Sequence, residues 1–270
     1  MKKILIILVV AAALFSFKAQ LKAVIYAFDF KVDYFDIDIL GNIYVVHDSE
    51  LALSNQKGEI KAVFSNSILG EISSIDASDA MNILVFYQDF AKLLFLDNTL
   101  SLKKSVIDLS DLGFPNASLA CLSYNNAFWI FDPVNQELVR INQFLDIVER
   151  SGNLNQIIDT EIDPDQLIEA GNMVYLKDKN KGIFIFDGYA AYQKRMPFIN
   201  VDDVQIIAPE LMAFLKNDTV FTYNMLRLNS DTLPINANEV KQMFIKNNRI
   251  HYLNKKGDLA SIEISSIKHD

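Results

Sequence analysis

Six segments of this chain repeat one pattern: a short apolar strand, a polar turn, a second apolar strand, another polar turn and a third strand. The second strands of these repeats begin 38 to 46 residues apart, near Ile43, Ile83, Ala127, Met173, Met212 and Ile250. A repeat of about 40 residues that contains only strands is the sequence pattern of a β-propeller. The sequence therefore predicts an all-β fold, a six-bladed β-propeller in which each repeat supplies most of one blade.

The last repeat predicts how the ring closes. The repeats span residues 35–66, 72–109, 117–148, 166–198, 204–235 and 240–264, and the sixth ends after three strands. Residues 21–30, LKAVIYAFDF, read as a strand but precede the first repeat. A strand from this segment that completes the last blade would leave no open sheet edge between the two ends of the ring. Residues 153–168 are interpreted as a connector between blades, with one possible helical turn.

The N-terminal residues predict export. Lys2 and Lys3 precede an apolar stretch over residues 4–15, which has the length of a signal peptide and is short for a membrane span. We expect cleavage after Ala19, which leaves residues 20–270 as a single propeller domain; the alternative is an uncleaved N-terminal anchor. The predicted location is therefore periplasmic or outer-membrane associated.

The net charge excludes two classes of partner, and the single cysteine excludes a disulfide framework. The formal net charge is -9, and loss of Lys2, Lys3 and Lys18 with the signal peptide would make it -12. An acidic surface repels the phosphates of nucleic acids and anionic lipids, so neither is an expected partner. The one cysteine, Cys121, lies in an apolar run and reads as a small buried side chain. No disulfide framework is possible with one thiol.

One motif supports a family resemblance. Residues 38–50, DILGNIYVVHDSE, resemble the paired strands of NHL-type six-bladed propellers, and similar stretches begin at Gly171 and Asn247. The resemblance implies a platform that binds proteins, nucleic acids or small ligands, and the acidic charge argues against nucleic acids here. The export signal, the Asn and Lys in the turns and the low glycine content, 9 in 270, are similar to those of envelope proteins from Bacteroidota. In such bacteria, propellers of this type serve in envelope machines, including secretion and gliding systems.

No sequence motif identifies a catalytic, metal or cofactor site. The three histidines, His47, His251 and His269, do not have metal-ligand spacing. Six-bladed lactonases hold an axial calcium ion with Asp, Asn and Glu side chains, and the equivalent candidates here are Asp36, Asp38, Asp76, Asp79, Asn82, Asn126 and Asn172. Most of them flank strand ends, where such residues also stabilise turns. No catalytic residue, metal ligand or cofactor is therefore predicted.

Two loops between repeats are candidate partner-binding surfaces. One carries Leu109, Leu112 and Phe114, and the other carries Phe198. Either loop could contact a protein partner or fold back on its own blade. Trp129, which apolar residues flank, is expected in the core rather than at a ligand site.

These observations favour a non-catalytic exported propeller that binds a protein as a subunit or scaffold of an envelope assembly. Two alternatives stay open: a calcium-dependent hydrolase or lactonase with an axial carboxylate site, and a sensor of a small ligand. Carboxylates and amides that meet at the channel mouth would favour the enzyme, whereas a lateral apolar patch would favour the binding subunit.

Overall fold

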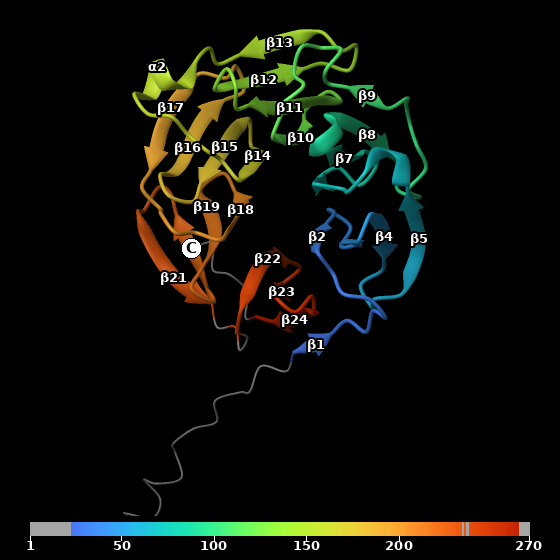
Figure 1. Cartoon of the computed structure of the whole chain (residues 1–270). Coiled ribbons are helices and arrows are strands. Elements are labelled where there is room, and N and C mark those ends of the chain that lie inside the picture. The colour runs from blue at the N-terminus through green and yellow to red at the C-terminus, as the bar shows by residue number, and fades with distance from the viewer. Residues whose placement is uncertain (1–22, 234, 236–237, 265–270) are drawn as a thin grey trace, which may run out of the picture.

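The computed structural model describes residues 23–233, 235 and 238–264. These residues form six four-stranded antiparallel sheets arranged around a central axis, so the prediction of a six-bladed β-propeller is confirmed (Figure 1). The predicted signal peptide lies outside the described residues. No helix within the described part of the chain is long and apolar enough to cross a membrane.

The first three blades follow the chain from the inner strand outward. Blade 1 comprises β2 (Tyr34–Ile37), β3 (Ile43–His47), β4 (Glu50–Ser54) and β5 (Ile60–Ser65). Blade 2 comprises β6 (Ser74–Asp76), β7 (Ile83–Tyr87), β8 (Lys92–Leu96) and β9 (Ile107–Asp108). Blade 3 comprises β10 (Leu119–Ser123), β11 (Ala127–Asp132), β12 (Glu137–Ile141) and β13 (Ile147–Arg150). Two 3₁₀ turns, Ser67–Leu69 and Gln88–Phe90, accompany the first two blades.

The remaining blades repeat this order. Blade 4 comprises β14 (Gln166–Ala170), β15 (Met173–Asp178), β16 (Gly182–Asp187) and β17 (Tyr192–Met196). Blade 5 comprises β18 (Asp203–Ala208), β19 (Leu211–Lys216), β20 (Thr219–Asn224) and β21 (Asn229–Leu233). Blade 6 contains β22 (Val240–Lys246), β23 (Arg249–Asn254) and β24 (Leu259–Glu263). The short helix α2 (Leu154–Ile158) lies in the connector where the sequence allowed one helical turn.

An N-terminal strand closes the ring, as the sequence predicts. The strand β1 (Val24–Ile25) pairs antiparallel with β24, through Val24 opposite Ser261 and Ile25 opposite Ala260. Two main-chain hydrogen bonds extend this contact, from Tyr26 to Leu259 and from Val32 to Gly257, both at 3.0 Å. Gly257 has φ +81°, and a Cβ there would lie 2.8 Å from the Lys31 Cβ. Glycine is therefore needed where the closing segment crosses this turn.

The core consists of six clusters, one between each pair of neighbouring blades. The middle strands β7 and β11 are buried along their whole lengths, because each lies between two other strands and between two blades. Trp129 is completely buried, so the expectation that it belongs to the core is confirmed. This packing fixes the six inner strands around the axis, where they form the candidate site.

Candidate functional site

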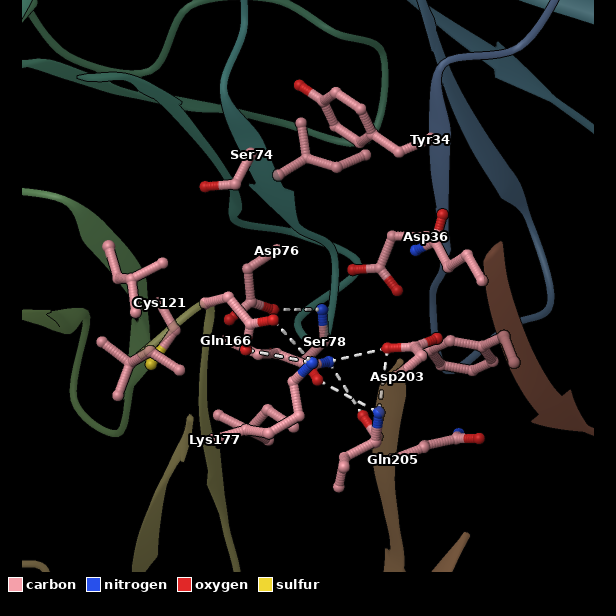
Figure 2. A pocket seen from close by; sticks show the side chains of 18 of the residues that line it. Tyr34, Asp36, Ser74, Asp76, Ser78, Cys121, Gln166, Lys177, Asp203 and Gln205 are labelled. Atoms are coloured by element: carbon pink, nitrogen blue, oxygen red, sulfur yellow. Dashed lines mark hydrogen bonds and ion pairs between the residues drawn. The ribbon is translucent and has the colours of Figure 1, made fainter. Parts of the chain in front are cut away.

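The inner strands enclose a cavity on the propeller axis. All six of them, β2, β6, β10, β14, β18 and β22, contribute residues to its wall, and its volume is about 590 Å³. Figure 2 shows polar side chains from several blades around it, including Asp36, Asp76, Gln166 and Asp203. Cavities of this size accept a small organic molecule or the tip of a loop.

Three glutamines of the cavity wall join neighbouring blades. Gln166 accepts a hydrogen bond from Val204 N at 3.0 Å and donates to Val204 O at 2.9 Å. Gln205 makes the same pair of bonds with Ile245, and Gln242 makes it with Phe35. Each amide thus supplies one acceptor and one donor to the main chain of the next inner strand.

Three aspartates make the corresponding contacts as acceptors. Asp36 accepts from Ile37 N and, across the boundary between blades, from Ala77 N, both at 2.7 Å. Asp76 accepts from Ser78 N at 2.9 Å and from Leu122 N at 2.8 Å. Asp203 accepts from Val204 N at 2.9 Å and from Met243 N at 2.8 Å. Both oxygens of every carboxylate therefore hold a main-chain N–H.

The boundary between blades 3 and 4 uses different residues. Burial, followed by the charges of Asp76 and Glu169, raises the pKa of the Cys121 thiol. The Trp129 indole donates to the Glu169 carboxylate. Cys121 is buried as expected, and a raised pKa keeps it in the unreactive thiol form.

The charges on the cavity wall are strongly desolvated. Burial raises the pKa of Asp36 to about 7, with a further contribution from the negative charge of Asp76. Burial also raises the pKa of Asp203 to about 6, although Lys177 opposes the shift. Asp36 borders the cavity, so part of its surface is accessible even though protein surrounds it. These carboxylates consequently titrate near neutral pH.

Lys177 places a buried cation at one side of the cavity. Its Nζ donates to Asp165 at 3.0 Å, to Asp202 O at 2.9 Å and to Val201 O at 3.3 Å. A buried ammonium needs such partners, because it has lost its water. Asp202 pairs through its side chain with Lys179 at 2.7 Å. The carboxylates of Asp165 and Asp202 are therefore each paired with a lysine.

The seven calcium-ligand candidates do not form one cluster. Asp36 and Asp76 lie on the axial cavity, whereas Asp38 and Asn172 lie in hairpin turns, where Asp38 accepts from Leu40 N and Asn42 N and Asn172 has φ +62°. The other three, Asp79, Asn82 and Asn126, line a second cavity of about 320 Å³ together with Glu169.

In that second cavity a lysine already holds one of the candidates. Lys103 Nζ donates to Asn82 Oδ1 at 3.1 Å, and Asp79 accepts from Met81 N at 2.9 Å. Among the described residues, no group of three or more His, Cys, Asp or Glu side chains is placed to hold a metal ion.

The two described histidines border the closing segment rather than the axial cavity. His47 stacks on Phe30 with 3.8 Å between ring centroids, and His251 stacks on Tyr26 with 6.0 Å. Phe28 lies between Tyr26 and Phe30, at 6.2 and 5.3 Å. Five rings therefore run in one stack across the closure. The alternation of Tyr26, Phe28 and Phe30 in the sequence is the signal that could have predicted it.

The four predicted partner-binding residues pack at the boundaries between blades. Leu109 and Phe114 are buried between blades 2 and 3, and the half-buried Leu112 packs against the same cluster. Phe198 is half-buried, and its ring lies 4.8 Å from Tyr223 and 5.1 Å from Phe214. All four side chains thus contact neighbouring blades of this chain, and their role in binding a partner stays a prediction.

A different apolar surface lies on the outside of blade 3. The outer strand β13 and the turn before it expose Phe144, Leu145, Ile147 and Val148, with Phe144 75% exposed. The outer strand of blade 4 instead exposes Gln193, Lys194 and Arg195. The outer strand of blade 1 also exposes two apolar residues, Ile60 and Val63, so blade 3 differs in the additional Phe144 and Leu145 of the turn before its outer strand. The sequence shows the residues but not that they lie at an exposed sheet edge.

Comparisons with known proteins establish the fold. No protein-family model matches this chain, and no curated protein matches it. Among solved structures, virginiamycin B lyase from Staphylococcus aureus is 15% identical with a TM-score of 0.61, over 88% of this chain and 82% of that one.

Two further similar structures represent other kinds of protein. BBS1N, solved in complex with ARL6DN, is 12% identical with a TM-score of 0.58, over 88% of this chain and 79% of that one. PorZ, a surface component of the type-IX secretion system of Porphyromonas gingivalis, is 14% identical with a TM-score of 0.50, over 70% of this chain and 26% of that one. Similar propellers thus include an enzyme, a protein complex and a secretion component.

Proposed function

We propose that this protein is a non-catalytic, exported propeller that binds a protein partner through the outer edge of blade 3, as a subunit or scaffold of a bacterial envelope assembly. The observation that carries this proposal is the exposed apolar strand β13 with the preceding Phe144 and Leu145. This is the lateral apolar patch that distinguishes a binding subunit from an enzyme with an axial site.

The edge of β13 offers two kinds of contact at once. β13 pairs with β12 on one side, and in the described part of the chain no strand pairs with its other side. A partner strand could add there through main-chain hydrogen bonds, while Ile147 and Val148 give it apolar contacts. An apolar edge without a partner is a site of aggregation, which the proposed partner would cover.

Comparisons and sequence support the envelope setting. PorZ is described as a bacterial surface component of a secretion system, and BBS1N was solved with a bound protein. The predicted signal peptide would export this chain from the cytoplasm. The net charge of -9 is consistent with a protein partner rather than nucleic acid.

The test is affinity purification of the tagged protein from detergent-solubilised envelopes of its own host. The variant is Ile147→Lys, and the matched control is Ile60→Lys, since Ile60 is an equally exposed residue on the outer strand of blade 1. We expect one stoichiometric envelope protein with the wild type and the control, and its loss with Ile147→Lys. Recovery of the propeller alone, or equal recovery with both variants, would contradict the proposed interface.

The second candidate function is a sensor of a small ligand. The axial cavity of about 590 Å³ favours it, because its wall is built from all six blades and contains buried charges. The two functions use different surfaces, so one protein could have both.

A further inference from the structure

The axial cavity carries an excess of negative charge. Seven carboxylates and two ammonium groups line it, namely Asp33, Asp36, Asp76, Asp165, Glu169, Asp202 and Asp203 with Lys177 and Lys241. Asp165 and Asp202 are paired with Lys177 and Lys179. Within the described residues, no ion pair involves Asp36, Asp76 or Asp203. Asp33 and Glu169 also have no ion pair among the described residues, and Asp36, Asp76 and Asp203 are the three of these five carboxylates that accept a main-chain N–H from a neighbouring blade.

These three carboxylates are held in place before any ligand arrives. Each accepts one N–H from a neighbouring residue in its own blade and one from the next blade, at 2.7 to 2.9 Å. They come from β2, β6 and β18, and Figure 2 shows them around one space. Because the main chain fixes their orientation, a cation in the cavity would need little rearrangement of the protein.

The rest of the wall suits the body of an organic molecule. Tyr34 and Phe244 are half-buried aromatic residues of the lining, and the half-buried Ile168 and Ile206 are apolar. Aromatic faces attract ammonium and guanidinium groups, and apolar walls pack against an alkyl chain. Ser74 adds a buried hydroxyl on the same wall that has no hydrogen-bond partner among the described residues. The wall thus has unused hydrogen-bonding capacity as well as unpaired charge.

We propose that the axial cavity binds an organic cation, an alkyl chain that ends in an ammonium or guanidinium group, and that Asp36, Asp76 and Asp203 supply its counter-charge. The inference identifies the ligand class of the second candidate function and does not depend on the protein-binding role of blade 3. An alkyl cation uses both the carboxylates and the apolar wall, and at about 590 Å³ the cavity has space for such a chain.

A bare divalent metal ion fits these residues less well. Such an ion needs about six oxygen ligands at 2.3 to 2.6 Å, roughly the distances typical of calcium. Main-chain hydrogen bonds hold the three aspartates in place, and among the described residues no group of three or more His, Cys, Asp or Glu side chains is placed to hold a metal ion. An organic cation can be stabilised at longer range, without direct coordination.

The experiment uses isothermal titration calorimetry on the purified protein. The probe is agmatine, which carries a guanidinium and an ammonium group on a four-carbon chain, and the control ligand is the uncharged pentylurea. We expect saturable binding of agmatine at pH 8 and at least about ten-fold weaker binding of pentylurea, a difference that corresponds to one tenfold step in Kd. Equal binding of agmatine and pentylurea would overturn the proposal. The proposal would also be overturned if neither agmatine nor the arginine peptide described below bound to the protein.

Proton release provides an independent readout on the wild type. A cation favours the ionised carboxylates, so at pH 7 its binding should displace protons from Asp36, whose pKa is about 7, and from Asp203, whose pKa is about 6. Affinity should therefore fall as the pH is lowered from 8 to 5. Titrations in buffers of different ionisation enthalpy measure the released protons directly. An affinity that does not depend on pH would contradict the assigned counter-charge.

A matched pair of variants locates the site. Asp76→Asn removes one charge from the cavity, whereas Asp89→Asn removes one from an exposed turn. We expect about ten-fold weaker binding with Asp76→Asn and no change with Asp89→Asn. If Asp76→Asn does not fold, the comparison of agmatine with pentylurea on the wild type still tests whether the cavity binds a cation. Equal affinity of folded Asp76→Asn and wild type would place the binding elsewhere.

The same chemistry can come from a free amine or from a basic side chain of another protein. A peptide with one arginine between glycines serves as the second probe. Binding of agmatine alone would identify a small-molecule ligand. Binding of the peptide with similar or higher affinity would identify an arginine side chain, inserted from a protein, as the occupant.

Discussion

At the scale of single residues, side chains near the axis join neighbouring blades by hydrogen bonds, just as main-chain pairing joins the strands inside each blade. Inner strands of neighbouring blades belong to different sheets, so their main chains have no ladder between them. Gln166, Gln205 and Gln242 bridge three of these boundaries with paired amide bonds. Polar residues near the axis therefore have a structural role that is independent of any ligand.

Gln166→Leu tests this role. The leucine would leave Val204 O without the Gln166 donor, while Val204 N keeps only Asp203 as acceptor, and an unsatisfied buried polar group costs about 1–3 kcal/mol. We expect the free energy of unfolding in urea to fall by that amount. Gln193→Leu, on the exposed outer strand of blade 4, should change it by no more than about 0.5 kcal/mol. Equal effects of the two substitutions would contradict the bridging role.

At the scale of elements, the closing segment relies on its aromatic side chains more than on its strand. β1 contains two residues, both exposed, with Ile25 69% exposed. Tyr26 is buried instead, and its hydroxyl lies 3.1 Å from His251 Nδ1 and 3.4 Å from Ser261 Oγ. The stack from His251 to His47 then continues across the boundary between blades 6 and 1.

Tyr26→Ala should therefore destabilise the ring far more than Ile25→Ala. Removal of a buried aromatic ring costs about 3–5 kcal/mol, whereas truncation of an exposed residue costs about 0.5 kcal/mol or less. Thermal unfolding followed by circular dichroism would compare the two midpoints. Equal midpoints would mean that the strand pairing, rather than the stack, holds the closure.

His251 makes the closure sensitive to acid. Burial lowers the pKa of its imidazole to about 4 from 6.5, and Arg249 adds to the shift. Between pH 6.5 and about pH 4, the unfolded chain therefore binds a proton at His251 that the folded chain does not bind. The free energy of unfolding consequently decreases as the pH falls through this range, by up to ~3 kcal/mol. The Tyr26 hydroxyl lies 3.1 Å from its Nδ1, and Ser261 is opposite it on the neighbouring strand.

The variant His251→Phe isolates this contribution. Asp36 and Asp203 act in the opposite direction, because their raised pKa values mean that stability is lost as the pH rises from about 4 to about 7. We therefore expect the difference in unfolding free energy between His251→Phe and wild type to change steadily between pH 6.5 and 4. A difference that does not vary with pH would show that His251 is not the titrating group.

At the scale of the whole molecule, the links between blades bear on the calcium-dependent alternative. The axial carboxylates are engaged with main-chain N–H groups, and Lys103 holds Asn82 in the second cavity. We expect the midpoint of thermal unfolding to be the same in EDTA and in about 1 mM calcium chloride, a concentration that saturates many extracellular calcium sites. A calcium-dependent rise of several degrees would favour the enzyme.

The architecture was predictable from the sequence because it repeats. Strand periodicity and turn residues recur in all six repeats, and the incomplete last repeat indicates the closing strand, which the structure confirms. Trp129 and Cys121 were also predictable as buried residues, since apolar neighbours flank them.

The site was less predictable because it depends on contacts between distant residues. Gln166 and Val204, or Gln242 and Phe35, meet only after the ring has formed. Leu109 and Phe114 lie in a loop between repeats, and nothing local distinguishes a loop that covers its own blade from one that binds a partner. Phe144 and Ile147 fit the strand pattern, so their exposure becomes visible only in the assembled blade.

The closure of blade 6 requires the first strand of the chain to pair with the last one, so this pairing can form only after the last strand is available. Tyr26 contacts Ser261, which is 235 residues further along the chain. A chain that crosses a membrane from its N-terminus would deliver the closing strand first and its partner strand last. Contacts between such distant residues form slowly, and strand edges that have not yet paired are prone to aggregation. If the chain is exported as we propose, the strand that enters the new compartment first is therefore the last to be folded, and the molecule passes through a stage in which its ring is open.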